Sequence, residues 1–278
     1  MRIGIGLPTS TPGGSGEALV VWAQAADDGP FSSLGVVDRV VYDAYDPIVA
    51  LSAAAAVTSR VQLCTMIVIG PVRGTAVLAK QAATLDAVSG GRLVLGLSIG
   101  ARRDDYEAAG AQWSDRGAQL SAQIAELREI WDDPAIGPAP LREGGPTVLV
   151  GGGSGASFRR AARHADGYVH GGGPPRAFAT AAEKARAAWI ESGRPGEPAL
   201  WGQSYFTLTD PAGGEAYMRE YYAFTGGFVE RIAAGLLTTP AAIREQINGY
   251  ADAGCDELVL LPATSNPEEL DRLADIVS

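Results

Sequence analysis

Short runs of aliphatic and β-branched residues alternate with longer alanine-rich stretches along this chain. The runs lie at 3–7, 34–38, 61–69, 93–99, 147–150, 167–170, 200–208 and 257–261. Strands that alternate with helices at this spacing pair in parallel through right-handed crossovers. Eight such units in 278 residues predict an α/β fold of the (β/α)8 or TIM barrel type, as one domain covering 1–278. A doubly wound open sheet is the alternative arrangement of the same elements.

One connection is longer than a barrel requires. Residues 213–237 stand between the seventh strand and its helix and are rich in tyrosine and phenylalanine. This connection leaves from the C-terminal face, where barrels build active sites, so we expect a lid over an apolar or aromatic substrate. The alternative is a small helical pair that covers its own apolar face. The aromatic side chains expected to meet the substrate are Tyr42, Tyr205, Tyr221, Tyr222 and Phe224.

Composition excludes several classes of partner. The net charge of −10 argues against nucleic acid, because phosphate binding needs a basic face. Cys64 and Cys255 stand in apolar runs and are expected in the core, and no Cys/His spacing fits a metal site. No apolar run reaches the roughly 18 residues of a membrane span, so we expect a soluble, cytoplasmic protein.

Two motifs resemble those of serine hydrolases. The stretch GLSIG at 96–100 fits G-x-S-x-G, with Ser98 as nucleophile, and HGGG at 170–173 resembles the oxyanion loop of lipases. In that fold the HGGG motif precedes the serine, and the histidine of the triad lies late in the chain. The order is wrong here, so we do not expect a hydrolase.

The stretch GGGSGA at 151–156 fits a dinucleotide-binding pattern between a strand and a helix. Such a site needs an acid at the end of the next strand, where His170 stands, so a nicotinamide site is not expected. Exposed amides at a helix N-terminus favour an anion in any fold. We therefore favour phosphate binding over a plain glycine-rich turn capped by Ser154.

The block at 57–110 resembles the core of the bacterial luciferase-like flavin- and deazaflavin-dependent oxidoreductases. It combines a strand ending near Gly70-Pro71, the helix AKQAATLD, the turn SGGRL, a fourth strand and the acidic-aromatic DDYEAAG. Further matches at 33–39, 148–168 and 250–260 extend the resemblance over nearly the whole chain. It implies a tricyclic cofactor, coenzyme F420 or FMN, over the C-terminal ends of the barrel strands.

The resemblance also implies which residues meet the cofactor. A non-prolyl cis peptide at Met66-Ile67 would back the ring, and Ser98 would line the ring pocket rather than act as a nucleophile. Arg116 would be a charged partner of the phosphate. The remaining phosphate contacts that the resemblance implies are Gly152, Gly153, Ser154, Gly155 and Ser157.

The chain departs from the family pattern at the end of the second strand. Many members carry Asp-His or Glu-His there, whereas this chain has Asp38-Arg39. The catalytic candidates are therefore Asp38, Arg39 and His170, with Tyr42 as a further proton-transfer group. Ile99 stands where members that oxidise glucose 6-phosphate carry a glutamate, which disfavours that reaction.

Three functions follow from the resemblance. We favour F420-dependent hydride transfer to or from a small organic substrate, because the strand-two histidine is absent. An FMN-dependent two-component monooxygenase, supplied with reduced flavin by a separate reductase, is the alternative, and a non-catalytic flavin-binding protein is the third. A homodimer is expected through the small-residue helices at 48–57 and 76–85.

Overall fold

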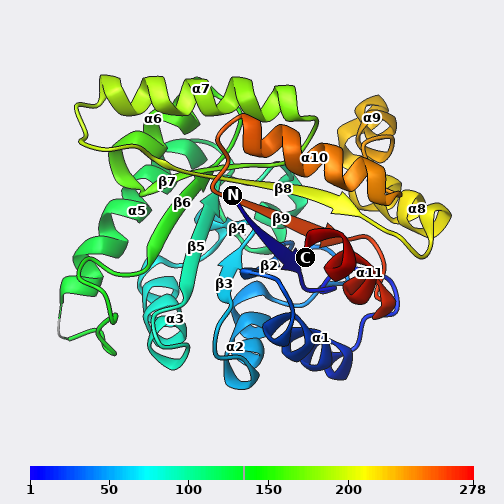
Figure 1. Ribbon diagram of the computed structural model, residues 1–278. Coiled ribbons are helices and arrows are strands. Elements are labelled where there is room, and N and C mark those ends of the chain that lie inside the picture. Colours follow the sequence, from blue (N-terminus) through cyan, green and yellow to red (C-terminus); the bar gives the residue numbers. More distant parts are fainter. Residues whose placement is uncertain (134) are drawn as a thin grey trace.

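The computed structural model describes residues 1–133 and 135–278. All of its paired strands run in parallel and form a closed barrel inside a layer of helices (Figure 1), which confirms the predicted fold class. The pairing of β3 with β5 closes the ring. The strands are β1 Arg2–Gly6, β2 Ser33–Val36, β3 Gln62–Thr65, β4 Val68–Ile69, β5 Leu93–Ser98, β6 Thr147–Gly151, β7 Gly167–His170, β8 Ala199–Phe206 and β9 Glu257–Pro262.

Several helices begin at a capping side chain. Asp46 accepts hydrogen bonds from the first amides of α2, and Thr239 caps α10 in the same way. Proline occupies the first turn of α2, α7, α8 and α10, where no backbone donor is needed. The helices are α1 Gly16–Asp28, α2 Pro47–Val57, α3 Thr75–Val88, α4 Arg103–Ala108, α5 Arg116–Asp132, α6 Gly155–His164, α7 Pro175–Glu191, α8 Pro211–Tyr221, α9 Val229–Ala233, α10 Pro240–Asp252 and α11 Glu268–Val277.

The third barrel strand is divided. The sequence predicts one strand at 61–69, whereas the ladder ends at Thr65 and resumes at Val68. The Met66–Ile67 peptide bond between the two pieces is cis, as the family resemblance implies. The short 3-10 helix η1, Gly70–Val72, follows directly.

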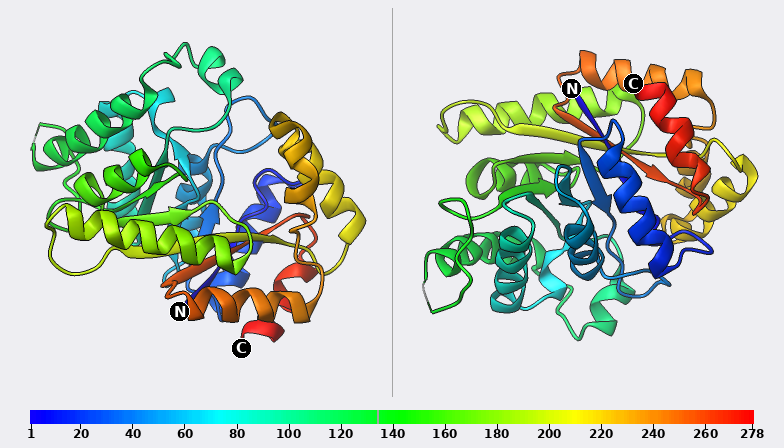
Figure 2. Two further views of the ribbon diagram at one scale, coloured as in Figure 1. Left: turned by 90° about the horizontal axis from the view of Figure 1, so that it is seen from above. Right: turned by 60° about the horizontal axis from the view of Figure 1, so that its bottom comes forward.

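The long connection after β8 is a helical excursion that returns to its starting point. It contains α8, the 3-10 segment η2 Ala223–Phe228 and α9, and it begins at Pro211, slightly earlier than expected. Figures 1 and 2 show α8 and α9 at the carboxyl end of β8. Leu237 then forms a parallel bridge with Phe206, so the two ends of the excursion lie side by side.

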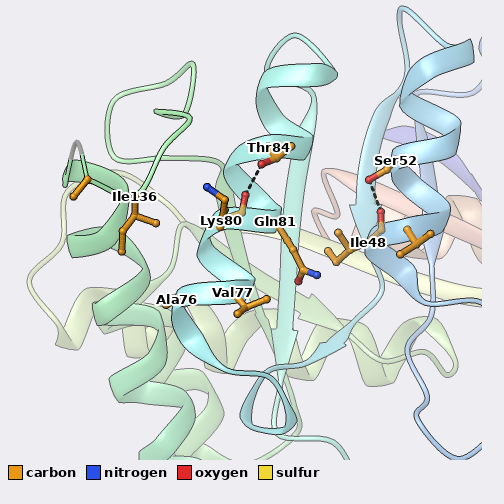
Figure 3. Close-up of a pocket in the computed structure, with 10 residues that line it drawn as sticks. Ile48, Ser52, Ala76, Val77, Lys80, Gln81, Thr84 and Ile136 are labelled. Atoms are coloured by element: carbon orange, nitrogen blue, oxygen red, sulfur yellow. Dashed lines mark hydrogen bonds between the residues drawn. The ribbon is translucent and has the colours of Figure 1, made fainter.

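An apolar groove runs along the outside of the barrel between α2 and α3 and reaches the loop after α5 (Figure 3). Its volume is about 630 Å³, and it is lined by Ile48, Val49, Ser52, Ala76, Val77, Lys80, Gln81, Thr84, Ala135 and Ile136. Among the residues described, no helix is both long and apolar enough to cross a membrane.

Candidate active site

The predicted site residues come from several strands and meet at one end of the barrel. Parallel strands in a closed barrel end at the same face. Ser98 ends β5, the glycine run at 152–155 follows β6, and Asp38 and Arg39 follow β2. The C-terminal face therefore carries the residues that the sequence analysis selects.

Ile67 fills a gap that two glycines leave in the barrel wall. A Cβ atom at Gly151 would lie 2.3 Å from Ile67 Cδ1, and one at Gly96 would lie 3.1 Å from Ile67 Cγ2. Any larger residue at 151 would collide with this side chain, so the glycines and Ile67 form one packed unit. Ile67 remains partly exposed while Met66 is buried in the lumen. The break in strand three thus presents an apolar surface at the mouth, which suits the face of a flat ring.

The N-terminus of α6 is closed by a capping box and preceded by an exposed glycine run. Ser157 Oγ accepts a hydrogen bond from the amide of Ser154, and the Ser157 amide donates to Ser154 Oγ, so the two serines form a capping box. The preceding turn keeps Gly152 at φ 130°, a conformation that suits only glycine. Positions 152–155 are exposed, and a Cβ at Gly153 would meet nothing within 4 Å. Open space in front of a capped helix N-terminus fits a phosphate group.

Arg116 begins α5 beside this helix. Its guanidinium lies 3.7 Å from the ring centre of Trp113 and donates to the Trp113 carbonyl at 3.2 Å, while its Nε has no partner among the described residues. Arg160 of α6 donates to the carbonyl of Gly117 at 2.7 Å, which fixes the start of α5 against α6. Arg116 therefore stands at the end of α5 that Arg160 links to α6.

Asp38 holds the broken strand in place. Its Oδ2 accepts from the amide of Ile69 at 2.9 Å, and its Oδ1 pairs with Arg73 at 2.9 Å. Arg73 also pairs with Asp46, the cap of α2, at 2.8 Å. Burial raises the pKa of the Asp38 carboxyl, although Arg73 opposes this effect. Asp38 therefore joins β2, β4 and α2 through hydrogen bonds that occupy both of its oxygens.

Arg39 is enclosed by protein groups at the mouth. Its guanidinium lies 4.9 Å from the ring centre of Tyr42 and 5.2 Å from that of Tyr221. It donates to the carbonyls of Val41 at 2.6 Å and Tyr221 at 3.4 Å, and its Nε lies 3.5 Å from Asp105. The charge is therefore neutralised, and the side chain connects the loop after β2 to α4 and α8.

The tyrosines of the insertion face inward. Tyr217 and Tyr221 of α8 are at least nine-tenths buried in the lumen cluster, as is Tyr205 of β8, and Tyr222 donates to the Tyr205 hydroxyl at 3.2 Å. Burial raises the pKa of the Tyr205 and Tyr221 hydroxyls well above the ordinary value, so they stay neutral hydrogen-bonding groups. Phe224 lies on the exposed tip, with Arg102 4.8 Å from its ring centre. The segment covers part of the mouth with its aromatic face turned to the barrel.

His170 lies on the other face of its strand. Val169 belongs to the lumen cluster, while the His170 ring packs against Phe178 of α7 and its Nδ1 lies 3.3 Å from the Tyr168 hydroxyl. Its Nε2 has no partner among the described residues, and burial lowers its pKa. Its environment is the helix layer near the end of β7, away from Asp38 and Arg39.

Two polar residues that the sequence analysis does not select belong to this region. Asp105, fully buried, accepts from the amides of Val40 and Val41 at 2.9 and 2.8 Å and pairs with Arg39. Gln203, 6% exposed, donates to the Gly171 carbonyl, and its Oε1 has no partner within the described residues. The sequence could have indicated Gln203, because side chains alternate along β8 and Gln203 shares its face with Trp201 and Tyr205.

A closed parallel barrel with an apolar, cis-bonded break in its third strand and a glycine-rich, exposed helix N-terminus at its mouth is the arrangement that the luciferase-like class predicts. The chain belongs to the luciferase-like monooxygenase family, whose model matches residues 1–253. A Mycobacterium tuberculosis protein is 31% identical over 187 residues, 55% of this chain and 65% of that protein, so the chain spans just under two thirds of this relative.

Solved structures share the fold at low sequence identity. An F420-dependent secondary alcohol dehydrogenase in complex with an F420–acetone adduct is 15% identical, with a TM-score of 0.83 over 99% of this chain and 97% of the other. The oxygenating constituent of 3,6-diketocamphane monooxygenase from Pseudomonas putida, in complex with FMN, is 18% identical, with a TM-score of 0.77 over 100% and 96%. Both F420 and FMN proteins therefore have this fold.

Proposed function

We propose that the protein, with residues 1–278 acting as one domain, is an oxidoreductase that uses coenzyme F420 for hydride transfer to or from a small organic substrate. The observation that carries this choice is the environment of Arg39. It occupies the position of the usual strand-two histidine, and its guanidinium is held by Asp105, Val41 and Tyr221. An arginine side chain stays protonated in proteins, so it does not exchange protons near neutral pH as a histidine does. The reaction at this mouth therefore proceeds without proton transfer from that position.

The chain's own residues supply the binding surfaces. Ile67, supported by Gly96 and Gly151, backs the ring, and Ser98 lines its edge. The amides at the α6 N-terminus, the glycines at 152–155 and Arg116 bind the phosphate. When bound, the cofactor supplies a flat ring that takes or gives a hydride. Tyr42 and Tyr222 exclude water from the side of the insertion.

The FMN alternative rests on a different finding. The matching family model is described as a monooxygenase, and one structural neighbour contains FMN. With FMN the protein would receive reduced flavin from a separate reductase. The third candidate, a non-catalytic flavin-binding protein, is favoured by the burial of the insertion tyrosines over the lumen. The cytoplasmic location and the separate reductase remain predictions.

Anaerobic titration of the protein with reduced and oxidised F420 and FMN distinguishes these functions. We expect micromolar binding of F420 and at least tenfold weaker binding of FMN, or about 1.4 kcal/mol. Preferential binding of reduced FMN, followed by oxygen uptake when substrate is added, would replace the proposal with the monooxygenase. Tight binding without turnover of alcohols, aldehydes, ketones or alkenes would favour the non-catalytic protein.

The catalytic candidates are tested separately. We include Asp38 and His170 in the proposal as proton-transfer candidates and Arg39 as a charged group that binds a polar or anionic part of the ligand. Asp38→Asn, Arg39→Gln and His170→Asn are compared in their pH–rate profiles at saturating cofactor. A residue that transfers protons shifts the profile, whereas a residue that only supports the fold lowers the rate equally at every pH.

A further inference from the structure

A second cavity lies at the mouth, next to β1 and β2 and separate from the α6 N-terminus. It has a volume of about 500 Å³ and is formed by the loop at 9–14, the loop at 42–45 and the end of α8. Tyr42 forms one wall, and its ring packs at 5.1 Å against Tyr221. The cavity is therefore a neighbour of the Arg39 region and uses side chains that the proposed cofactor site does not.

The inner wall of this cavity offers an unused hydroxyl. Thr9 is 3% exposed and lines the cavity, and its Oγ1 has no hydrogen-bond partner among the described residues. The neighbouring hydroxyls are engaged, because Ser10 Oγ lies 2.7 Å from Tyr217 Oη and Thr11 donates to the Pro8 carbonyl. A buried hydroxyl without a partner is costly, so a ligand that hydrogen-bonds Thr9 gains binding energy.

The rim of the same cavity carries negative charge. Asp43 and Glu220 both line it and are exposed, and neither forms an ion pair within the described part of the chain. The nearby cation Arg39 is held by Asp105. Burial raises the pKa of the Tyr42 hydroxyl, and both carboxylates raise it further. Their charges therefore lie beside the same wall of the cavity. The rim thus favours a cation, because its two carboxylates form no ion pair with the described residues.

We infer that this cavity binds a small organic cation that carries both a protonated amine and hydroxyl groups. The amine lies between Asp43 and Glu220, and a hydroxyl reaches Thr9. In this role the cavity holds the polar end of a substrate, so the inference rests on the proposed function. It differs from the apolar substrate that the aromatic insertion predicts, because the insertion tyrosines pack into the lumen and leave this polar cavity beside them.

The test uses 2-amino-1,3-propanediol as the cationic probe and glycerol as its neutral counterpart. Ligand-observed NMR titration is performed on the full chain without cofactor. We expect saturable binding of the amine and at least fivefold weaker binding of glycerol. Asp43→Asn combined with Glu220→Gln is expected to weaken the amine about tenfold and to leave glycerol unchanged. Thr9→Val is expected to weaken both probes about threefold, because it removes one neutral hydrogen bond.

Glu191→Gln, at the exposed end of α7, is the matched control for lost negative charge and is expected to bind like the unmodified protein. Unchanged melting temperatures establish that each variant is folded. The inference is wrong if the amine does not bind, or if the double variant binds it as tightly as the unmodified protein. Cofactor titration is an independent measurement, so failure of F420 and FMN binding would contradict the proposed function alone.

Discussion

Ser154 caps the N-terminus of α6 whether or not a phosphate is bound. A substitution that keeps this cap therefore tests phosphate binding separately from folding. Asp and Asn are both good N-caps, so either substitution keeps α6 folded. We expect Ser154→Asp to weaken cofactor binding more than tenfold, because a carboxylate would stand where the phosphate charge must go. Ser154→Asn, the neutral control, is expected to change affinity less than threefold. Equal affinities for the two variants in a fluorescence titration would mean that the glycine run is only a turn.

Ile67 is the side chain against which the ring would lie. Ile67→Asp brings a carboxylate against the glycine pair in a partly buried place, so we expect cofactor binding to be abolished. Ile67→Val keeps an apolar, β-branched side chain and is expected to preserve binding and most of the activity. Isothermal titration of both folded variants is the measurement. Tight binding by the Asp variant would place the ring elsewhere on the mouth.

His170 predicts a pH dependence of stability. Burial lowers its pKa below the ordinary value of 6.5, so the unfolded chain takes up a proton before the folded one. The stabilisation is complete above that value and is lost as the pH falls through the folded pKa. We expect the melting temperature of His170→Asn to fall less between pH 7 and pH 5 than that of the unmodified protein. The other histidine, His164, also has a lowered pKa, so His164→Asn shows its separate contribution. Identical slopes of melting temperature against pH for His170→Asn and the unmodified protein would contradict the expectation.

At the scale of elements, Arg39 connects the insertion to the barrel. Its bond to the Tyr221 carbonyl and its contact with the Tyr221 ring join α8 to the loop after β2. We expect Arg39→Gln to increase hydrogen exchange in 211–233 severalfold while exchange in β5 and β6 stays unchanged. Arg219→Gln is the control, because Arg219 lies on the exposed face of the same helix and pairs only with Glu215 and Glu230 among the described residues. Equal exchange in both variants would show that Arg39 does not hold the insertion.

The sequence predicts the elements well where the signals are local. The helices expected at 48–57 and 76–85 lie within α2 and α3, and Asp46 caps the start of α2. The division of strand three is foreseen only through the family resemblance, since periodicity alone predicts one strand. The partners of Arg39 are not foreseen, because Asp105 and Tyr221 lie far from it in sequence. The Thr9 hydroxyl, which has no partner among the described residues, is not foreseen either, because its surroundings depend on how two loops and the end of α8 meet.

At the scale of the whole molecule, the groove between α2 and α3 carries the predicted dimer contact. Val49 of α2 and Val77 of α3 line the groove and are 66% and 62% exposed, so both are open to contact with a second copy. Figure 3 shows Val77 beside the groove. We expect a homodimer that Val49→Asp combined with Val77→Asp converts to a 28.7 kDa monomer. Light scattering at micromolar concentration measures this. Ile190→Asp, at a 78% exposed site on α7, is the control variant and is expected to stay dimeric. If the unmodified protein is a monomer, the expectation is wrong.

The bridge between Phe206 and Leu237 has an evolutionary consequence. The chain leaves and re-enters the barrel at adjacent positions. The residues between them can therefore be exchanged without changing the register of any strand. Helices of another length can be grafted there while Ile67, Ser154 and the rest of the C-terminal face keep their positions. Under the proposed function, the residues that would select the ligand and those that would hold the cofactor thus lie in separate stretches of the gene, so the first could diversify while the second are preserved.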